Sequence, residues 1–336
     1  MKRILFLAFI AISSTQIKAQ DTALRVMFYN VENLFDTIDT PDKDDAEFLP
    51  NSPIQNNTAN YNLKLDHLAK VVNAAFGVKS SPDLLGVCEV ENRAVVEDLA
   101  SRLDKQKSLQ VIHEESLDGR GIDNALIYET KKLKLVEHGV AEVELIGDRP
   151  TRYILWANFK MKGNDRSITV FVNHWPSRGG GEEESEPKRL KAEGVLKGTI
   201  YQLRLKYPDS DEIVMGDFND YPTNKSMKDL ENCILPVPES PCLVNMHEYL
   251  QGTGVGSHAY KGEWGMLDQI LVSKGLYSEK NEFYIPNNSG QIVSFDWMMY
   301  ESNFDQKMYP SRFYGKDKVF GGYSDHLPVS LVILKK

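Results

Sequence analysis

The chain has 336 residues, with 39 Lys or Arg and 48 Asp or Glu, so its formal net charge is -9. This acidic balance argues against a protein whose main task is to grip long polyanions without sequence preference. Its three cysteines, Cys88, Cys233 and Cys242, are too few for a disulfide scaffold, so a hydrophobic core must provide the stability.

The N-terminus has the layout of a secretory signal peptide. Lys2 and Arg3 precede an apolar run at 4–12 and a polar stretch that ends at Ala19. The apolar run is about half of the roughly 20 residues that a spanning helix needs, so no membrane anchor is expected. We predict a signal peptide at 1–19, a single domain at 20–336, and a secreted or periplasmic monomer. Removing Lys2, Arg3 and Lys18 takes away three positive charges and moves the net charge from -9 to -12.

Short apolar runs, many of them rich in β-branched residues and bounded by turn residues, recur along the rest of the chain and predict strands. These runs are 24–29, 84–90, 124–128, 153–159, 168–172, 213–215, 267–272 and 329–334. Between some of them lie helical patterns: one at 65–76 that ends at Gly77, and one from Pro187 to about Tyr207. Strands mixed with helices predict an α/β fold with mixed sheets.

Two stretches have few strand signals and are predicted to be long loops. The first, 36–60, is acidic and rich in Asn and Pro, and the second, 284–322, carries many aromatic residues among Arg and Lys. Long ordered loops in one domain are often functional. Cys233 and Cys242 could close a small disulfide loop after export, which would leave Cys88 unpaired and buried in its strand.

Polar residues follow several predicted strands where each strand ends. The run GDFND at 216–220 places Asp217 and Asn219 after an apolar run, although Gly, Asp and Asn also form plain turns. The run SDHLP at 324–328 places Asp325 and His326 before the last strand, where adjacent side chains point to different faces. One of these two residues could bind a metal while the other serves catalysis.

Four more strand ends supply a single polar residue each. Glu89 ends an apolar strand, where a carboxylate is costly to desolvate unless it is paired, binds a cation or is simply solvated. His174 and Asn30 end two other strands, and Asp268 lies within a strand pattern, where it could orient His326. Six strand ends that deliver Asn, Asp, Glu or His predict one polar site at the rim of a sheet core.

In this order, the motifs resemble the endonuclease/exonuclease/phosphatase superfamily of DNase I-like metal-dependent phosphoesterases. The resemblance spans roughly 24–334, and GDFN together with SDHLP carries it. The NVENLF and VNHWPSR runs are similar to those of the secreted bacterial branch. The resemblance implies a four-layer α/β sandwich, with two mixed β-sheets packed face to face, helices on the outside, and a site at one end.

The resemblance also implies roles for individual residues. Asn30, Glu89 and Asp325 would hold Mg²⁺ or Mn²⁺, as one ion or two, in oxygen coordination. The catalytic set would contain a base for the attacking water, two donors to phosphoryl oxygens, and a histidine oriented by a carboxylate: Asp217, Asn219, His174, His326 and Asp268. Three arginines could grip phosphate, with a looser match to the family: Arg120, Arg152 and Arg178.

The implied activity is hydrolysis of a phosphate ester, with DNA or RNA as candidate substrates. A nuclease is the leading hypothesis, because Trp297, Tyr309, Phe313 and Tyr314 in the aromatic loop could stack on bases. The same loop could instead be a hydrophobic lid packed on the core. A phosphatase or phosphodiesterase for inositol phosphate, sugar phosphate or sphingolipid head groups is the alternative, and the acidic charge favours it. A non-catalytic binding module is the remote alternative.

Overall fold

The computed structural model describes residues 22–78, 80–145, 147–231 and 243–336. The segment predicted as a signal peptide and both members of the predicted Cys233–Cys242 disulfide lie outside these ranges. Within them, no helix is both long enough and apolar enough to cross a membrane. Cys88 is buried in its strand and has no disulfide partner among the described residues.

The first of two central sheets brings both ends of the described chain together. Its strand order is β13-β17-β1-β2-β4-β3, with β14 also paired to β17, and only the β1–β2 pair is parallel. These strands are β1 (Thr22–Leu34), β2 (Leu84–Val90), β3 (Leu109–His113), β4 (Asp123–Glu129), β13 (Phe283–Tyr284), β14 (Gln291–Ile292) and β17 (Val329–Lys335).

The second central sheet is built from the middle of the chain. Its order is β5-β6-β7-β8-β12-β9, and only the β7–β8 pair is parallel. The strands are β5 (Leu133–Ala141), β6 (Ile154–Met161), β7 (Ser167–His174), β8 (Ser210–Asp217), β9 (Leu243–Asn245) and β12 (Asp268–Ser273). Both central sheets are therefore mixed.

Alternation along each strand explains why the two sheets face each other. In β1, Val26 and Phe28 point into the core between the sheets, while Met27 packs against the outer helices. In β7, Val172 points into the same central core and Phe171 packs on the other helical layer. Both faces of each sheet are thus buried, as the nearly continuous apolar runs require.

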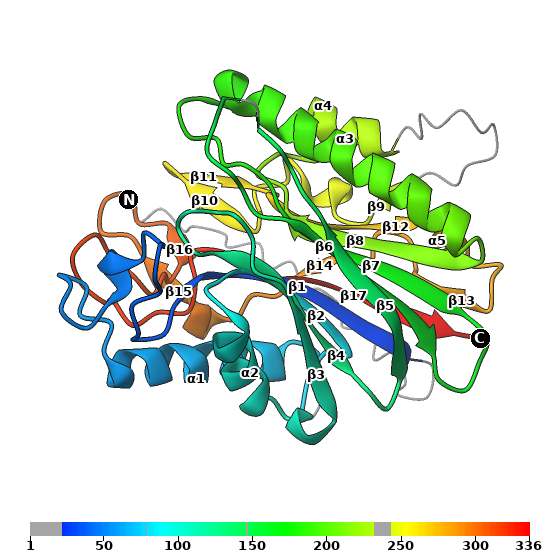
Figure 1. Ribbon diagram of the computed structural model, residues 1–336, viewed down its shortest axis with the longest axis horizontal. Helices are drawn as coiled ribbons and strands as arrows, with labels where there is room; N and C mark the ends of the chain where they lie inside the picture. Colours follow the sequence, from blue (N-terminus) through cyan, green and yellow to red (C-terminus); the bar gives the residue numbers. More distant parts are fainter. Residues whose placement is uncertain (1–21, 79, 146, 232–242) are drawn as a thin grey trace, which may run out of the picture.

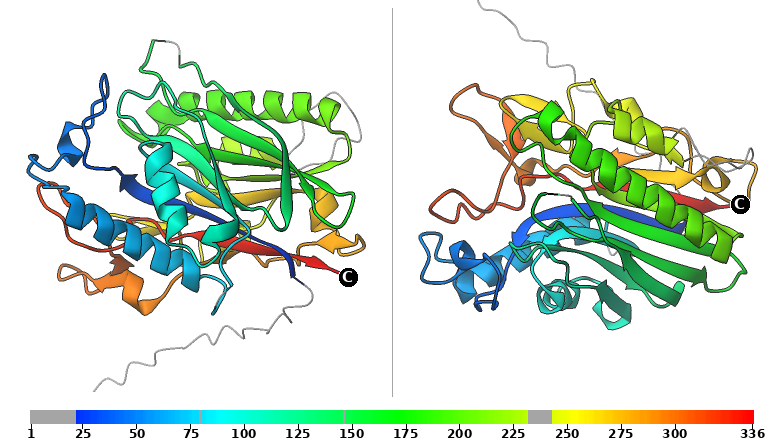
Figure 2. Two further views of the ribbon diagram at one scale, coloured as in Figure 1. Left: turned by 60° about the horizontal axis from the view of Figure 1, so that its bottom comes forward. Right: turned by 45° about the horizontal axis from the view of Figure 1, so that its top comes forward.

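Helices cover the outer faces, which gives four layers (Figure 1). One layer holds α1 (Thr58–Ala74) and α2 (Arg93–Ser101), and the other holds α3 (Glu182–Lys206) and α4 (Lys225–Glu231). The views in Figure 2 show the same order of layers from two other sides. This arrangement confirms the predicted α/β sandwich with two mixed sheets and outer helices. The short elements outside the layers are α5 (Lys274–Tyr277), η2 (Ala46–Phe48), η3 (Gln106–Ser108), η4 (Glu248–Leu250) and η5 (Asp296–Met298).

Gly86 shows how closely the two sheets approach. A Cβ at this position of β2 would lie 2.5 Å from Sδ of Met215 in β8 and 3.2 Å from the ring of Phe28. Because a side chain would collide with the opposite sheet, glycine permits the close packing at this point.

The helix boundaries differ from those predicted at two starts. The first helix begins at Thr58, because the Asn57 side chain accepts the backbone N–H groups of Ala59 and Asn60 as an N-cap. The third begins at Glu182 rather than at Pro187, which lies inside it. Three glutamates in its first turn favour the helix N-terminus electrostatically, whereas Pro187 removes one backbone hydrogen bond.

The two predicted long loops contain short ordered elements. Residues 36–60 include η2 and the start of α1, and residues 284–322 include β14, η5 and a hairpin. That hairpin pairs β15 (Met299–Glu301) with β16 (Met308–Pro310), and a second hairpin pairs β10 (His258–Tyr260) with β11 (Glu263–Gly265). Both hairpins project at the same end of the sandwich, on the left in Figure 1.

Candidate active site

Strand alternation aims the polar strand ends into the space between the sheets. His174 lies two residues after Val172, and Asp217 lies two residues after Met215, so both continue the inward-facing row. Asn30 bears the same relation to Phe28 in the other sheet. The polar site is therefore an extension of the central apolar core toward one rim.

Strand register then places the inward residues side by side. His174 is the register partner of Asp217 across the parallel β7–β8 pair, and Asp217 is the partner of Asp268 across the antiparallel β8–β12 pair. In the other sheet, Asn30 is the partner of Cys88, which directly precedes Glu89. Residues separated by more than 180 positions therefore meet because their strands end at the same rim.

Glu89 reaches this rim because of a backbone irregularity. Cys88 points into the central core, so regular alternation would turn Glu89 toward the outer helices. Instead the β2–β4 register shifts between Cys88 and Val90, and Glu89 has a positive φ of 61°. A bulge of this kind re-aims a side chain, and positive φ is uncommon for a non-glycine residue.

Asn30 connects the two sheets through its amide. Its Nδ2 donates to Oε1 of Glu89 and to Oδ2 of Asp217, in both cases at 3.1 Å. Its Oδ1 accepts the backbone N–H of Glu32 at 3.0 Å, so the amide oxygen is turned away from the two carboxylates. Asn30 therefore holds two carboxylates together here, whereas the resemblance assigns it to the metal.

Two imidazoles flank the carboxylate of Asp217. Nε2 of His174 lies 3.8 Å from Oδ2 of Asp217, and Nε2 of His326 lies 3.9 Å from the same oxygen. The other nitrogen of His326, Nδ1, is 2.7 Å from Oδ2 of Asp268. This contact fixes the ring so that Nε2 faces Asp217, which is the orientation that the sequence predicted for the His326–Asp268 pair.

The surroundings raise the pKa values of Asp217 and His326 and lower the pKa of His174. Burial, followed by the charge of Asp268, raises the pKa of Asp217 to about 7. Burial alone would lower the pKa of His326, but Asp268, Asp217 and Asp325 raise it well above its usual value. Burial, with Arg152 and Arg120, lowers the pKa of His174 well below its usual value. The surroundings thus favour the protonated form of His326 and the neutral form of His174.

The 324–326 segment is held against β1 by local hydrogen bonds. Oγ of Ser324 donates to the backbone oxygen of Asn30 at 2.7 Å and accepts the N–H of His326 at 3.1 Å. Oδ2 of Asp325 accepts from Nη2 of Arg312 at 3.4 Å, whereas His326 contacts Asp268. The two adjacent residues therefore do face different sides, as expected for an extended segment.

A network that the sequence did not predict supports Asp325. Nε of Arg312 donates to Oε1 of the buried Glu32, and the Glu32 carboxylate also accepts the backbone N–H groups of Phe313 and Tyr314. Burial, with Asp325, raises the pKa of Glu32 to about 7. The sequence signal for this network was Glu32, the acidic residue within NVENLF, because a carboxylate inside a strand needs partners.

Lys64 completes this network from helix α1. Its Nζ is buried, lacks a hydrogen-bond partner among the described residues, and lies 4.6 Å from the Phe313 ring centre and 4.7 Å from that of Tyr314. Burial lowers the pKa of Lys64 to about 8, against the opposing charges of Glu32, Asp325 and Glu89. Phe313 and Tyr314 therefore pack in the core, so the lid interpretation holds for them and they cannot stack on a base.

The remaining aromatic residues of the 284–322 segment divide between core and surface. Trp297 stacks on Phe295 and lies under Nζ of Lys70, 4.0 Å from its ring centre, so it belongs to the packed lid. Tyr309 belongs to the hairpin outside the core and stacks near Trp264, with ring centres 6.4 Å apart. Tyr309, one of the four residues predicted to stack on bases, lines a surface pocket.

Comparisons with known proteins agree with this geometry. A model of the Endonuclease/Exonuclease/phosphatase family matches residues 25–336. The chain belongs to this family. Family members are hydrolases that act on phosphate esters, and they generally use divalent metal ions. The comparisons contain nothing that confirms the predicted secreted bacterial branch.

Three individual proteins illustrate the similarity. A structure of an endonuclease/exonuclease/phosphatase family protein from Bacteroides thetaiotaomicron has a TM-score of 0.60 at 17% identity, covering 94% of this chain and 99% of that one. A mannosyl-6-phosphatase from the same organism has a TM-score of 0.56 at 16% identity, covering 92% and 99%. The Drosophila melanogaster protein angel is 24% identical over 208 residues, or 60% of this chain, and the match spans 57% of angel. The two structures share the fold.

The donor set at the rim fits a divalent cation. Oδ1 of Asp268 is buried and has no hydrogen-bond partner in the described part of the chain, although the Asp268 carboxylate lies beside that of Asp217. A concentration of buried negative charge is relieved by a hard cation bound to oxygen. Two groups of side chains have ligand atoms within 4.8 Å of one another in the described residues: Asp217-Asp268-His326 and His113-Glu115-Asp123. Neither group contains Glu89 or Asp325.

The predicted phosphate-binding arginines occupy different positions. Arg152 is buried, with Nη1 3.2 Å from Oδ2 of Asp118 and Nη2 donating to the backbone oxygen of Trp175 at 2.7 Å. Arg120 also binds Asp118 but is half exposed. Asp118 thus holds two arginines near His174. The sequence did not indicate this role for Asp118.

Arg178 and Asn219 support the loop after β8. Nε of Arg178 donates to the backbone oxygen of Asn219 at 2.7 Å, and its guanidinium stacks 3.9 Å from the ring centre of Tyr221. Nδ2 of Asn219 donates to the backbone oxygen of Trp175 at 3.0 Å. Both side chains therefore hold the loop that presents Asp217, and neither amide nor guanidinium is free in this arrangement.

Proposed function

We propose that this protein is a divalent-metal-dependent phosphodiesterase that uses Asp217 to activate water. One observation supports this most strongly: a buried carboxylate with a pKa of about 7 lies between two imidazole nitrogens and an amide from both sheets. A carboxyl group that titrates near neutral pH is suited to accept a proton from water. Oriented donors around it are suited to a phosphoryl group.

The roles of the neighbouring residues follow from their hydrogen bonds. His326, held and charged by Asp268, offers an N–H to a phosphoryl oxygen as negative charge develops there. Neutral His174 offers a second donor on the other side of Asp217. Asn219 is assigned the same task, but its amide must first leave the backbone oxygen of Trp175.

Glu89, Asp325 and Asn30 are the proposed ligands of Mg²⁺ or Mn²⁺, present as one ion or two. A bound ion would supply charge screening at the phosphate and stabilisation of the departing oxygen. Glu89 is the best placed of the three, because both of its oxygens already lie at the rim within hydrogen bonds to Asn30 and the backbone of Asn33. Asn30 must turn its amide before its oxygen can reach a cation.

Arg120 is the strongest of the three arginine proposals. Its half-exposed guanidinium lies next to the Asp118–Arg152 pair and can turn toward a substrate phosphate. Arg152, fully buried, acts by fixing Asp118 and the backbone after β7. Arg178 acts through the position of the Asp217 loop.

A nuclease-like phosphodiesterase is the leading form of this proposal, with DNA or RNA as substrate. A phosphatase, or a phosphodiesterase for inositol phosphate, sugar phosphate or sphingolipid head groups, is the alternative. The net charge of -9 favours the alternative, because an acidic surface repels long polyanions. The solved mannosyl-6-phosphatase shares the fold and shows that this fold serves a sugar phosphate in that protein.

We further propose that the protein is exported and is either secreted or periplasmic. The support is Lys2 and Arg3 before the apolar run at 4–12, followed by Ala19. N-terminal sequencing of the mature protein from its native host should begin near residue 20. An intact N-terminus that begins at Met1 would contradict export by cleavage.

The activity is tested with purified protein that begins at residue 20. Bis-p-nitrophenyl phosphate, plasmid DNA, RNA and p-nitrophenyl phosphate are incubated with Mg²⁺ or Mn²⁺, with and without chelator. We expect the diesters to be hydrolysed faster than the monoester and chelator to stop the reaction. Faster hydrolysis of the monoester would favour the phosphatase, and no hydrolysis of any ester would favour the non-catalytic binding module.

A further inference from the structure

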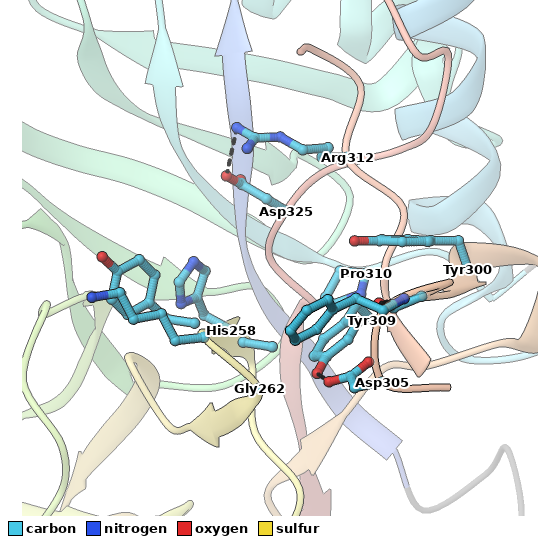
Figure 3. A pocket seen from close by; sticks show the side chains of 13 residues that line it. His258, Gly262, Tyr300, Asp305, Tyr309, Pro310, Arg312 and Asp325 are labelled. Carbon is cyan, nitrogen blue, oxygen red and sulfur yellow. Dashed lines mark hydrogen bonds and ion pairs between the residues drawn. The ribbon is translucent and has the colours of Figure 1, made fainter. Parts of the chain in front are cut away.

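A pocket with a volume of about 490 Å³ lies between the β10–β11 and β15–β16 hairpins. This volume lies within the range of sites that bind small molecules. Figure 3 shows His258 on one wall, Tyr300 and Tyr309 on the opposite wall, and the Arg312–Asp325 pair at one end. The pocket is therefore bounded by two hairpins that lie outside the four layers.

The pocket adjoins the candidate active site directly. The His258 ring contacts the His326 ring at an interplanar angle of 36°, with 4.6 Å between centres, and the two residues also form a backbone bridge. Asp325 both lines the pocket and precedes His326 in the chain. A phosphate held between His326 and Asp217 would therefore carry its organic substituent into this pocket.

Exposed aromatic rings line the pocket. Phe304 is 98% exposed, Tyr260 66% and Tyr300 47%. Exposed apolar clusters in soluble proteins commonly mark binding sites. Three large exposed rings at the edge of one pocket therefore indicate a binding site. Tyr309 forms a fixed part of the wall, because its hydroxyl donates to Asp305 and its ring lies near Trp264.

Polar groups lie among these rings. Ser302, Asp305, Lys261 and Arg312 line the same pocket and offer donors and acceptors of both charges. Flat apolar faces with hydrogen-bonding groups at their edges suit a planar heterocycle that carries its own donors and acceptors.

We propose that this pocket binds an unpaired nucleobase attached to the scissile phosphate, with Phe304, Tyr300 and Tyr260 as its stacking surface. This inference rests on the proposed phosphodiesterase function and narrows its substrate to single-stranded or small nucleotide esters. A base within a duplex is stacked between its neighbours and can enter a separate pocket only after leaving the stack. The acidic net charge agrees with this, because it disfavours a long duplex.

The test compares two diesters that share the p-nitrophenolate leaving group. Thymidine 5′-(p-nitrophenyl phosphate) carries a base, and methyl p-nitrophenyl phosphate does not. We expect a KM about tenfold lower for the thymidine ester, because the stacking of one base strengthens binding by about a factor of ten. Phe304→Ala and Tyr300→Ala should raise the KM of the thymidine ester about tenfold and leave the methyl ester unchanged.

Phe320→Ala is the matched control, because Phe320 is also exposed and lies in the same long segment but outside the pocket. It should change neither KM. Equal rises in KM for both esters in the Phe304→Ala variant would place the p-nitrophenolate leaving group in the pocket and overturn the proposal. A KM for the thymidine ester that does not respond to Phe304→Ala or Tyr300→Ala would also overturn it.

Calorimetric binding of thymidine 5′-monophosphate separates this proposal from the proposed function. If neither diester is hydrolysed, the phosphodiesterase proposal fails, and the pocket is judged by binding alone. Binding that weakens about tenfold in Tyr300→Ala and is unchanged in Phe320→Ala would support the pocket. Binding of glucose 6-phosphate that depends on Tyr300, with no binding of the thymidine nucleotide, would assign the pocket to a sugar and overturn the nucleobase.

Discussion

The rim between the two sheets and the pocket between the two hairpins are adjacent but differ in construction. At the rim, buried side chains from both sheets hold one another: Asn30 binds Glu89 and Asp217, and Asp268 binds His326. At the pocket, rings such as Phe304 and Tyr260 stand largely in solvent on short hairpins. His258 joins the two regions through its ring contact with His326.

This difference separates chemistry from recognition. Reacting groups need fixed positions, which packed strands provide, whereas the organic part of a substrate can be selected by surface hairpins. Substitutions at the rim should therefore affect every ester, and substitutions at the pocket should affect esters according to their substituent. Substitutions remote from both should affect stability alone.

The largest expected effect belongs to Asp217. Asp217→Asn removes the proposed base and should lower kcat on bis-p-nitrophenyl phosphate by about 10³-fold. The same loss is expected for esters with and without a base, as measured by initial rates at saturating Mg²⁺. Loss confined to one class of ester would show that Asp217 contributes to recognition rather than to the chemical step.

The stability of this variant serves as its control. Because burial raises the pKa of Asp217 from 3.8 to about 7, the native state binds the extra proton between these values and its stability falls as pH rises through this window. Asn at this position cannot ionise. Urea unfolding at pH 8 with chelator should therefore find the variant at least as stable as the original protein, so that lost turnover cannot be attributed to unfolding.

Asp268→Asn should have the next largest effect. Asp268 orients His326 through the 2.7 Å contact, and its loss should lower kcat about 10²-fold with little change in KM. Steady-state kinetics on methyl p-nitrophenyl phosphate measures both constants. A rise in KM with unchanged kcat would instead give Asp268 a role in binding.

Much of the fold and the rim could be predicted from the sequence. The runs at 84–90 and 329–334 correspond to β2 and to most of β17, because apolar strands bounded by turns are a strong local signal. The convergence of Asn30, His174, Asp217 and Asp268 also agrees with the strand-end pattern. Their chemical roles stay predictions, since geometry brings residues together without testing turnover.

Features that depend on tertiary contacts could not be predicted. Glu89 reaches the rim through a positive φ and a register shift, which a sequence pattern does not encode. Helix α3 starts at Glu182, within an acidic stretch that also resembles a loop. Long-range packing produces the β15–β16 hairpin in the 284–322 segment. It also buries Phe313 and Tyr314 over Lys64.

An effect on stability rather than on turnover is expected for His247, which is not one of the reacting groups of the rim. Its Nδ1 accepts the N–H of Ile270 and its Nε2 donates to the backbone oxygen of Gln291, so the fold requires the neutral ring. Burial lowers its pKa from 6.5 to about 4. The unfolded state therefore binds more protons between pH 6.5 and 4, and stability should fall by up to about 3 kcal/mol as pH falls through this window.

His247→Gln removes this titration and should flatten the dependence of the unfolding free energy on pH between 6.5 and 4. Urea unfolding at several pH values measures the slope for both proteins. The variant should retain the kcat of the original protein at pH 7.5. An identical slope in both proteins would show that His247 is not the titrating group.

Mn²⁺ binding measured by electron paramagnetic resonance tests the central idea, that a cation is held at the rim beside Asp217. Glu89→Gln should weaken Mn²⁺ binding at least tenfold and raise the Mg²⁺ concentration needed for half-maximal turnover by a similar factor. Glu115→Gln, in the second acidic group, is the matched control and should leave both values unchanged. Unchanged Mn²⁺ affinity in Glu89→Gln, or a loss in Glu115→Gln instead, would contradict a catalytic metal at this rim.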